Sequence, residues 1–338
     1  MGRVIAVANQ KGGVGKTTTA INLASSFAAC EVNTLLVDCD PQSNATSGLG
    51  LVKDPERLNT YHLLVGATSA EEAVQATALE QLWLIPAHKN LIGANLELVE
   101  TERREFRLRD ALAPLYARYQ FVVLDCPPAL DLLTLNALVA ADAVLIPMQA
   151  EYFALEGISE LLDTIERIRG SFNPDLGIEG VVLTMFDERT NLAQQVTAEL
   201  KRFFGEKLCA TSIPRNIRLA EAPSHGKPAL LYDPRSKGAE SYIRLAKEII
   251  AHGIPAQEPI ADSADPGLHV PATDDVVAVG LAIEAVSGQT FGPTEVVAPN
   301  SADEQAAVVA GEAEAQVSQE QSGNVEEIPT TAEMDKSA

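Results

Sequence analysis

A chain of 338 residues can form one large domain or two small ones, and its 46% hydrophobic residues suffice for a sizeable core. The formal net charge of −22 is unevenly distributed, because residues 254–338 hold 16 Asp or Glu and a single basic residue, Lys336. These residues carry −15, which leaves −7 for residues 1–253. The charge argues against a globally basic nucleic-acid-binding protein, but it does not exclude a local basic patch.

The expected elements alternate between apolar strands and amphipathic helices as far as His252. Strands are expected at residues 4–8, 34–38, 82–86, 121–125, 143–147 and 180–185. Helices are expected at residues 20–29, 58–78, 97–119, 132–140, 157–169, 191–204 and 238–252, with a cap at Ser69 and a break near Pro114. Residues 43–50 are expected to be a loop. This alternation predicts an α/β fold, a mostly parallel sheet with helices on both faces.

From Gly253 onward the composition changes. Pro, Ala, Glu, Asp, Ser and Val dominate, and Phe291 is the one aromatic residue. Such a segment buries too little apolar surface to offset the entropy lost on ordering, so we expect a disordered acidic tail with a transient helix at residues 276–286. The sequence therefore predicts a domain of residues 1–252 and a tail of residues 253–338.

The cysteines and the N-terminus indicate the compartment. Cys30, Cys39, Cys126 and Cys209 are scattered without a Cys-X-X-Cys pair, which favours buried free thiols over disulfides or a metal site. The N-terminus has no charged and then apolar leader, and no apolar run reaches ~18 residues. We therefore expect a cytoplasmic protein that is not inserted in a membrane.

The first expected strand and helix are joined by a glycine-rich segment, Lys11-Gly12-Gly13-Val14-Gly15-Lys16-Thr17-Thr18. A turn of this kind is a phosphate cradle, because its N–H groups point inward and the helix dipole favours an anion. The Gly-X-X-X-X-Gly-Lys-Thr pattern is incomplete, since Gln10 replaces the first glycine and Lys11 adds a second lysine. Lys16 is expected to reach the β- and γ-phosphates, Thr17 to ligate Mg²⁺ and Thr18 to contact the α-phosphate.

Acidic residues follow two of the strands at their carboxyl ends, where ligand sites of open α/β sheets lie. Asp125 is expected to orient the water ligands of magnesium, with a helix cap as the simpler alternative. Asp40 is expected to face the γ-phosphate and polarise a water molecule. Asp38 is expected to be a magnesium or hydrogen-bond helper, and a turn cap before Pro41 is the simpler alternative for this pair.

These motifs resemble those of the deviant Walker A ATPases, and most closely the chromosomal ParA/Soj partition ATPases. The resemblance covers about residues 1–252. It rests on the loop at 11–18, on Asp38-X-Asp40-Pro41-Gln42 and on Asp125-Cys126-Pro127-Pro128. Further matching segments lie at residues 44–50, 151–157, 187–193, 213–216 and 221–228.

The resemblance implies a P-loop NTPase fold and an ATPase of weak basal activity that uses ATP and Mg²⁺. It also implies a homodimer that forms when ATP binds. Lys11 would cross to the phosphates held by the other subunit, and Gly12 would allow close approach at that interface. Pro214, Arg215 and Asn216 would lie near the adenine.

The family's ATP-bound dimer binds DNA without sequence preference, and a ParB-type partner stimulates its hydrolysis. The resemblance therefore implies a nucleoid-associated protein that drives chromosome or plasmid partitioning. The candidate DNA-binding residues are Arg189, Arg218 and Lys227, with Arg235 as an extension. A solvated charge or an internal ion pair is the simpler alternative for the arginines. Only eight residues precede Asn9, so no helix-turn-helix is expected there.

Four other functions fit the same residues less well. A MinD-like membrane ATPase needs a basic amphipathic C-terminal helix, whereas this tail is acidic. An iron–sulfur reductase of the nitrogenase iron-protein type needs two suitably placed cysteines per subunit, whereas here no second cysteine follows Cys126 in a glycine-rich loop. A tyrosine autokinase would have a C-terminal tyrosine cluster, whereas the last tyrosine is Tyr242. A scaffold with an inactive loop is disfavoured because Lys16, Thr17, Asp40 and Asp125 are all present.

Overall fold

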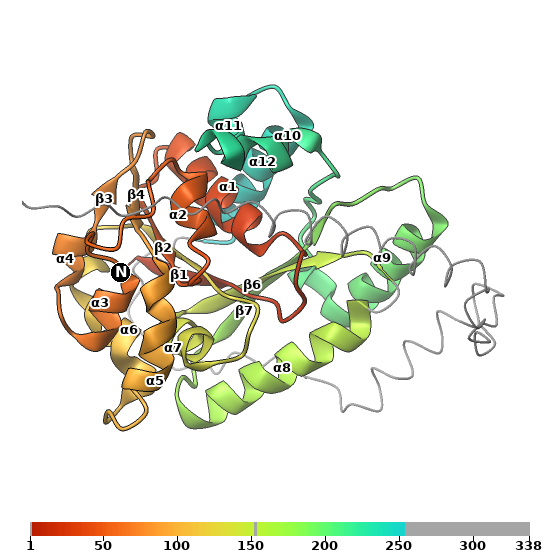
Figure 1. Cartoon of the computed structure of the whole chain (residues 1–338). Helices are drawn as coiled ribbons and strands as arrows, with labels where there is room; N and C mark the ends of the chain where they lie inside the picture. Colours follow the sequence, from red (N-terminus) through yellow and green to blue (C-terminus); the bar gives the residue numbers. More distant parts are fainter. Residues whose placement is uncertain (1, 152–153, 254–338) are drawn as a thin grey trace, which may run out of the picture. The chain divides into compact units, whose positions relative to one another are not determined.

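The computed structural model describes residues 2–151 and 154–253. Its centre is a sheet of seven strands in the order β3-β4-β2-β5-β1-β6-β7 (Figure 1). The strands are β1 (Arg3–Val7), β2 (Thr34–Asp38), β3 (Gln75–Ala76), β4 (Leu82–Ile85), β5 (Phe121–Asp125), β6 (Ala143–Gln149) and β7 (Gly177–Thr184). All neighbouring strands are parallel except the edge pair of β3 and β4. The predicted mostly parallel α/β sheet is confirmed.

Helices cover both faces of the sheet because the strand side chains alternate between two apolar clusters. Ile5 and Val7 belong to one cluster, and Val4 and Ala6 belong to the other. The first cluster is covered by the helices drawn above the sheet in Figure 1, which are α1 (Lys16–Ala29), α2 (Asn44–Gly48), α10 (Ile217–Glu221), α11 (Ala229–Tyr232) and α12 (Lys237–Ala251). The second is covered by α3 (Thr60–Val65), α4 (Ala70–Ala73), α5 (Ala94–Glu97), α6 (Arg107–Leu112), α7 (Leu132–Ala140), α8 (Ala154–Ser171) and α9 (Asn191–Phe204).

The prediction of a single helix at residues 58–78 is wrong, because this range contains α3, α4 and β3. Helix α3 ends at Val65 and is capped by Gly66, whose φ of 77° is a left-handed conformation that glycine adopts without strain. The chain then restarts as α4 with the expected cap at Ser69, whose side chain accepts a hydrogen bond from Glu72 N in a capping box. It continues as β3, which pairs antiparallel with β4.

Two other expected elements also differ. The helix expected at residues 97–119 is replaced by α6 between two 3₁₀ turns at 104–106 and 113–115, and the second turn contains Pro114, where the break was expected. The loop expected at 43–50 contains the short helix α2. Both differences reflect packing, since Leu108, Leu112 and Ala45 are buried in the two clusters.

The strand register brings the carboxyl ends of β1, β2 and β5 together. Val7 of β1 and Asp38 of β2 both pair with Asp125 of β5. Cys39 and Cys126, which follow β2 and β5, are buried free thiols as expected, and Cys30 and Cys209 are free and half-buried. Residues 254–338 lie outside the described part of the chain, so the boundary near residue 252 and the disordered tail remain predictions. No helix of residues 2–151 and 154–253 is long and apolar enough to span a membrane.

Candidate nucleotide-binding site

The glycine-rich loop runs from the end of β1 to the start of α1, at the carboxyl edge of the sheet. Gly13 and Gly15 have φ values of 76° and 86°, in the left-handed region that glycine adopts readily. A Cβ atom on Gly12 or Gly13 would meet no atom within 4 Å, so this side of the loop is open. A loop of left-handed turns before a helix N-terminus presents backbone N–H groups to an anion. The loop therefore fits a phosphate.

Neighbouring strands hold the loop in this shape. Asn9 Nδ2 donates a hydrogen bond of 2.8 Å to the carbonyl of Pro147. Gln149 Nε2 donates one of 3.2 Å to the carbonyl of Gly13. Thr184 Oγ1 donates one of 2.8 Å to the carbonyl of Val14. Because β6 and β7 supply all three partners, the cradle is fixed by the sheet rather than by the loop alone.

Lys16, the first residue of α1, is buried, with 8% of its surface exposed. Its ammonium donates a hydrogen bond of 3.0 Å to the carbonyl of Lys11, across the loop. Burial lowers the pKa of Lys16, while the nearby Asp125, Cys126 and Asp40 oppose this shift. An ammonium has three donors, and phosphate oxygens are the acceptors that its position favours.

Asp125 is fully buried, and neither of its carboxylate oxygens has a hydrogen-bond partner among the described residues. Burial is the largest cause that raises the pKa of Asp125 well above its ordinary value, and the neighbouring Asp38 adds to it. The hydroxyl of Thr17 and the ammonium of Lys16 oppose the rise, although the hydroxyl is not in hydrogen-bonding geometry. A buried carboxylate without partners is a costly arrangement that a cation relieves.

This donor set fits Mg²⁺. The described residues contain no group of three or more His, Cys, Asp or Glu side chains that could form a metal cage. Magnesium does not need one, because it usually keeps several water ligands and takes one or two carboxylates together with phosphate oxygens. The Thr17 hydroxyl would supply an oxygen ligand of that kind beside the phosphate cradle, and the Asp125 carboxylate would accept hydrogen bonds from the water ligands.

Asp38 and Asp40 shape the segment that follows β2. Asp38 Oδ2 accepts hydrogen bonds from Thr46 N at 2.8 Å and Thr46 Oγ1 at 2.7 Å, and Asp38 Oδ1 accepts one from Asp40 N at 3.1 Å. Burial raises the pKa of Asp38 to about 6, and the Thr46 bonds oppose this shift. These contacts match the hydrogen-bond alternative for Asp38. Asp40 is buried close to Lys16 and accepts a hydrogen bond of 2.9 Å from Gln42 N.

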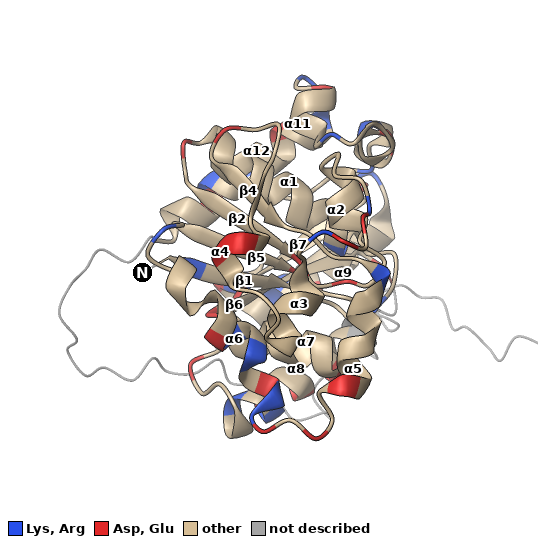
Figure 2. Cartoon of the chain, turned by 60° about the vertical axis from the view of Figure 1, so that its left-hand side comes forward, with Lys and Arg blue, Asp and Glu red and all other residues tan. Residues whose placement is uncertain are grey.

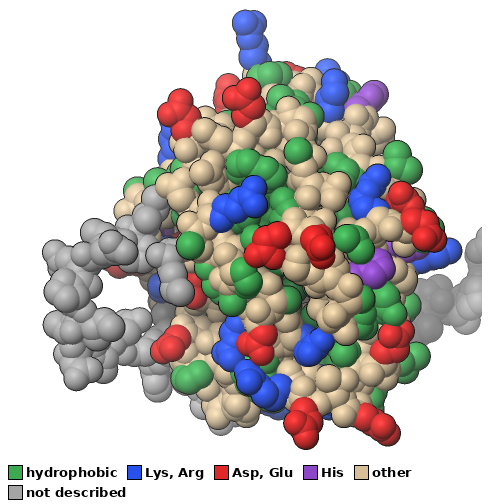
Figure 3. Space-filling view, turned by 90° about the vertical axis from the view of Figure 1, so that its left-hand side faces the viewer, with side chains coloured by type: hydrophobic (Ala, Val, Ile, Leu, Met, Phe, Trp, Pro, Cys, Tyr) green, Lys and Arg blue, Asp and Glu red, His purple; other side chains and the backbone are tan. Residues whose placement is uncertain are grey.

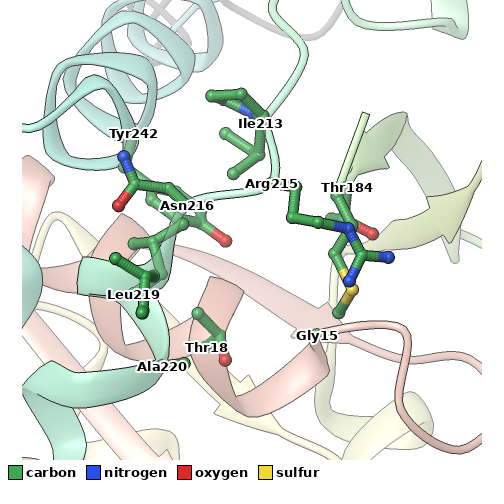
Figure 4. Close-up of a pocket in the computed structure, with 12 residues that line it drawn as sticks. Gly15, Thr18, Thr184, Ile213, Arg215, Asn216, Leu219, Ala220 and Tyr242 are labelled. Carbon is green, nitrogen blue, oxygen red and sulfur yellow. The ribbon is translucent and has the colours of Figure 1, made fainter. Parts of the chain in front are cut away.

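A cavity of about 370 Å³ opens beside the loop (Figure 4). Gly15 and Thr18 lie along one side of it, while Asn216 and Leu219 stand opposite Arg215 and Thr184. Pro214, Arg215 and Asn216, which were expected near an adenine, all line this cavity. The sequence analysis did not predict a binding role for the other lining residues, which are Thr184, Met185, Ile213, Ile217, Leu219, Ala220 and Tyr242. Thr184 and Met185 carried a signal, since they end an apolar strand at the edge where ligands bind, and Ile213 lies in one of the segments that match the family.

The candidate DNA-binding residues lie outside this cavity. Arg189 is highly exposed and forms an ion pair of 2.6 Å with Asp187. Arg218 forms ion pairs with Glu221 at 2.8 Å and Asp233 at 3.3 Å. Lys227 and Arg235 are exposed and form no ion pair with any described residue. Arg189 and Arg218 thus form the internal ion pairs that were the simpler alternative, so their role in DNA binding remains a prediction.

A glycine cradle after the first parallel strand, with Lys16 and Thr17 at the helix start and an acid at the end of an adjacent strand, defines a P-loop nucleotide-binding protein. Residues 2–178 match a family model described as an AAA domain. The chain is 53% identical over 255 residues to the chromosome partitioning protein ParA of Myxococcus xanthus, covering 75% of this chain and 90% of the relative. It is 54% identical over 253 residues to the sporulation initiation inhibitor protein Soj of Bacillus subtilis, covering 75% and 100%.

The chain belongs to the ParA/Soj family of chromosome-partitioning ATPases. Among solved structures it is similar to cobyrinic acid a,c-diamide synthase from Mycobacterium smegmatis with bound ADP and magnesium, at 35% identity and a TM-score of 0.66, covering 75% of this chain and 95% of that chain. The predicted family, P-loop fold and ATPase activity are confirmed. The predicted cofactors, ATP and Mg²⁺, are confirmed, since another structure of the same synthase has a bound ATP analogue and magnesium.

Proposed function

We propose that this protein is an ATP-dependent dimerising switch, which binds DNA without sequence preference as the ATP dimer and drives the partitioning of a chromosome or plasmid. One observation carries the proposal: the loop holds two lysines in different surroundings. Lys16 is buried and bonded within the loop, whereas 40% of the Lys11 side chain is exposed. One ammonium is therefore placed for the subunit's own phosphates, and the other is accessible to a second subunit.

In this proposal the backbone N–H groups of Gly12–Gly15 and the Lys16 ammonium bind the phosphates. Thr17 would ligate Mg²⁺ and Asp125 would orient its water ligands, where the ion neutralises phosphate charge. Thr18 would contact the α-phosphate, and the base would enter the cavity lined by Pro214, Arg215 and Asn216. Lys11 would reach the phosphates of the partner subunit, as an arginine finger does in other NTPases, and Gly12 would permit the close approach.

Asp40 would polarise the attacking water. Its backbone N–H is bonded to Asp38, and Asp38 is in turn bonded to Thr46, so the segment that carries Asp40 is anchored to the end of β2. In this proposal, a shift in the position of Asp40 would bring its carboxylate to a water near the γ-phosphate. We propose that hydrolysis is slow until a ParB-type partner makes that shift.

The DNA contacts in this proposal come from Arg189, Arg218 and Lys227, with an extension at Arg235. Figures 2 and 3 show basic and acidic residues interspersed on the faces that they present, so binding would depend on a local patch rather than on the overall charge. The arginines would exchange their carboxylate partners for phosphates. Such contacts carry no sequence information and weaken with salt. In this proposal, these phosphate contacts would hold the protein on the nucleoid.

Co-sedimentation with DNA and with anionic liposomes, each with ATP, ADP or no nucleotide, tests this proposal. We expect binding to DNA only with ATP, and no binding to liposomes.

The Asp40→Ala variant should stay on DNA with ATP, and its rate of ATP hydrolysis should fall by about 10²- to 10⁴-fold because Asp40 activates water. The Lys16→Ala variant should bind neither nucleotide nor DNA, and Lys201→Ala, an exposed lysine at the end of α9, serves as its control. ATP-independent DNA binding would contradict the proposal, and lipid binding would favour a MinD-like membrane ATPase.

A further inference from the structure

The ammonium of Lys11 has a partner within its own subunit. Lys11 Nζ lies 2.7 Å from Glu151 Oε2, as both a hydrogen bond and an ion pair. Glu151 follows β6, so the pair joins two segments 140 residues apart in the sequence. The side chains are 40% and 52% exposed, which leaves the ion pair open to competition from solvent and ligands.

The backbone around Glu151 places this carboxylate next to the loop. Glu151 N donates a hydrogen bond of 2.9 Å to the carbonyl of Gln149, which forms a tight turn after β6. Gln149 in turn bonds to the carbonyl of Gly13, and Pro147 accepts a bond from Asn9. The segment 147–151 therefore contacts the glycine-rich loop at three places. The ion pair of Glu151 is the last of these contacts along the segment.

We propose that Glu151 is a positioning residue, which holds Lys11 within its own subunit and releases it when two ATP-bound subunits dimerise. The inference rests on the proposed role of Lys11 at the partner's phosphates. The single positive charge of Lys11 cannot neutralise both the Glu151 carboxylate and a triphosphate in the other subunit. The Glu151 carboxylate and the partner's phosphates therefore compete for one cation, and the γ-phosphate, which ADP lacks, strengthens the competitor.

The size of the effect follows from the exposure of the pair. An exposed ion pair of this kind changes an equilibrium by about 1.4- to 5-fold. A symmetric dimer opens two such pairs, so their removal should strengthen dimerisation by the square of this factor, or about 2- to 30-fold. The affinity of one subunit for ATP should not change, because the pair lies outside that subunit's own phosphate contacts.

The test is the dimer dissociation constant with a non-hydrolysable ATP analogue and Mg²⁺, measured by sedimentation velocity. Glu151→Gln keeps the shape of the side chain and removes its charge, and we expect about 2- to 30-fold tighter dimerisation than in the wild type. The matched control is Asp110→Asn, which removes the exposed ion pairs of Asp110 with Arg103 at 3.2 Å and with Arg109 at 3.8 Å, outside the loop. It should dimerise like the wild type. Both variants should bind the analogue as monomers with wild-type affinity.

A second substitution separates this inference from the proposed function. Lys11→Ala and the double variant Lys11→Ala/Glu151→Gln should both remain monomeric. If Lys11→Ala dimerises like the wild type, the proposed role of Lys11 fails and the inference fails with it. If Lys11→Ala stays monomeric but Glu151→Gln dimerises no better than the wild type, the inference alone is wrong. A double variant that dimerises would show that Glu151 acts through another group, which also overturns the inference.

Discussion

At the scale of single residues, the site combines buried charges that oppose one another. Lys16 is a cation whose pKa is lowered by burial, and Asp125 is a carboxyl group whose pKa is raised by burial. The two lie close enough to shift each other's pKa, but neither carboxylate oxygen of Asp125 has a hydrogen-bond partner among the described residues. A site of this kind is under strain without ligands, because each charge is only partly neutralised. Binding of a phosphate and a divalent cation together relieves both.

This arrangement predicts a pH dependence for the protein without nucleotide or Mg²⁺. Because the folded-state pKa of Asp125 is raised, the folded protein binds this proton more tightly than the unfolded chain does. The free energy of unfolding should therefore fall as pH rises above the ordinary pKa of about 4. Asp125→Asn removes the titrating group and should raise the free energy of unfolding at pH 8 by about 1–3 kcal/mol, with a smaller gain at pH 5.

Urea unfolding of both proteins at the two pH values measures this difference, with Asp163→Asn on α8 as a control outside the site. The same Asp125→Asn variant should lose the dependence of nucleotide affinity on Mg²⁺. A variant that is less stable than the wild type at pH 8 would show that the Asp125 carboxylate is neutralised within the fold.

At the scale of the elements, the segment after β2 depends on one buried threonine. Thr46 donates its hydroxyl and its backbone N–H to Asp38, and its hydroxyl accepts a hydrogen bond of 2.9 Å from Ala87 N, after β4. This side chain thus ties α2 to the ends of two neighbouring strands. It also fixes the segment on which Asp40 lies.

Thr46→Val keeps the shape of the side chain and leaves both Asp38 and the Ala87 N–H short of a partner. We expect the free energy of unfolding to fall by about 1–3 kcal/mol, because buried groups lose hydrogen bonds. Thr68→Val, in the exposed turn before α4, is the matched control and should have little effect. Chemical denaturation of the three proteins provides the comparison. Equal stability of Thr46→Val and the wild type would mean that the tie is dispensable.

The sequence predicted the elements whose signal is local, and it missed those that packing decides. The glycine-rich loop, the strands and Asp125 follow from spacing, because apolar runs and glycines mark them directly. The break at Gly66 is a local glycine signal that the prediction overlooked, whereas the edge strand β3 is decided by its pairing with β4. Most of the cavity also escaped, because Leu219 and Tyr242 come from separate helices that only the tertiary fold brings beside Gly15. The partner of Lys11 was hidden for the same reason, since Glu151 is 140 residues away.

At the scale of the whole molecule, the chain combines a candidate phosphate site with a second, exposed lysine, which in our proposal serves a neighbouring subunit. The carboxyl ends of β1, β2 and β5 gather Lys16, Asp40 and Asp125, while Lys11 faces Glu151 at the margin of the site. The family to which the chain belongs fixes the ATPase activity. In our proposal, the exposed Lys11 links ATP binding to dimerisation and then to DNA binding.

The mass of the protein in solution, measured by light scattering with ATP and Mg²⁺, tests this link most directly. We expect the 36.0 kDa chain to double its mass with ATP and to remain a monomer with ADP. The Lys11→Ala variant should bind ATP and remain a monomer with either nucleotide. A Lys11→Ala protein that doubles its mass with ATP as the wild type does would contradict the proposed role of Lys11.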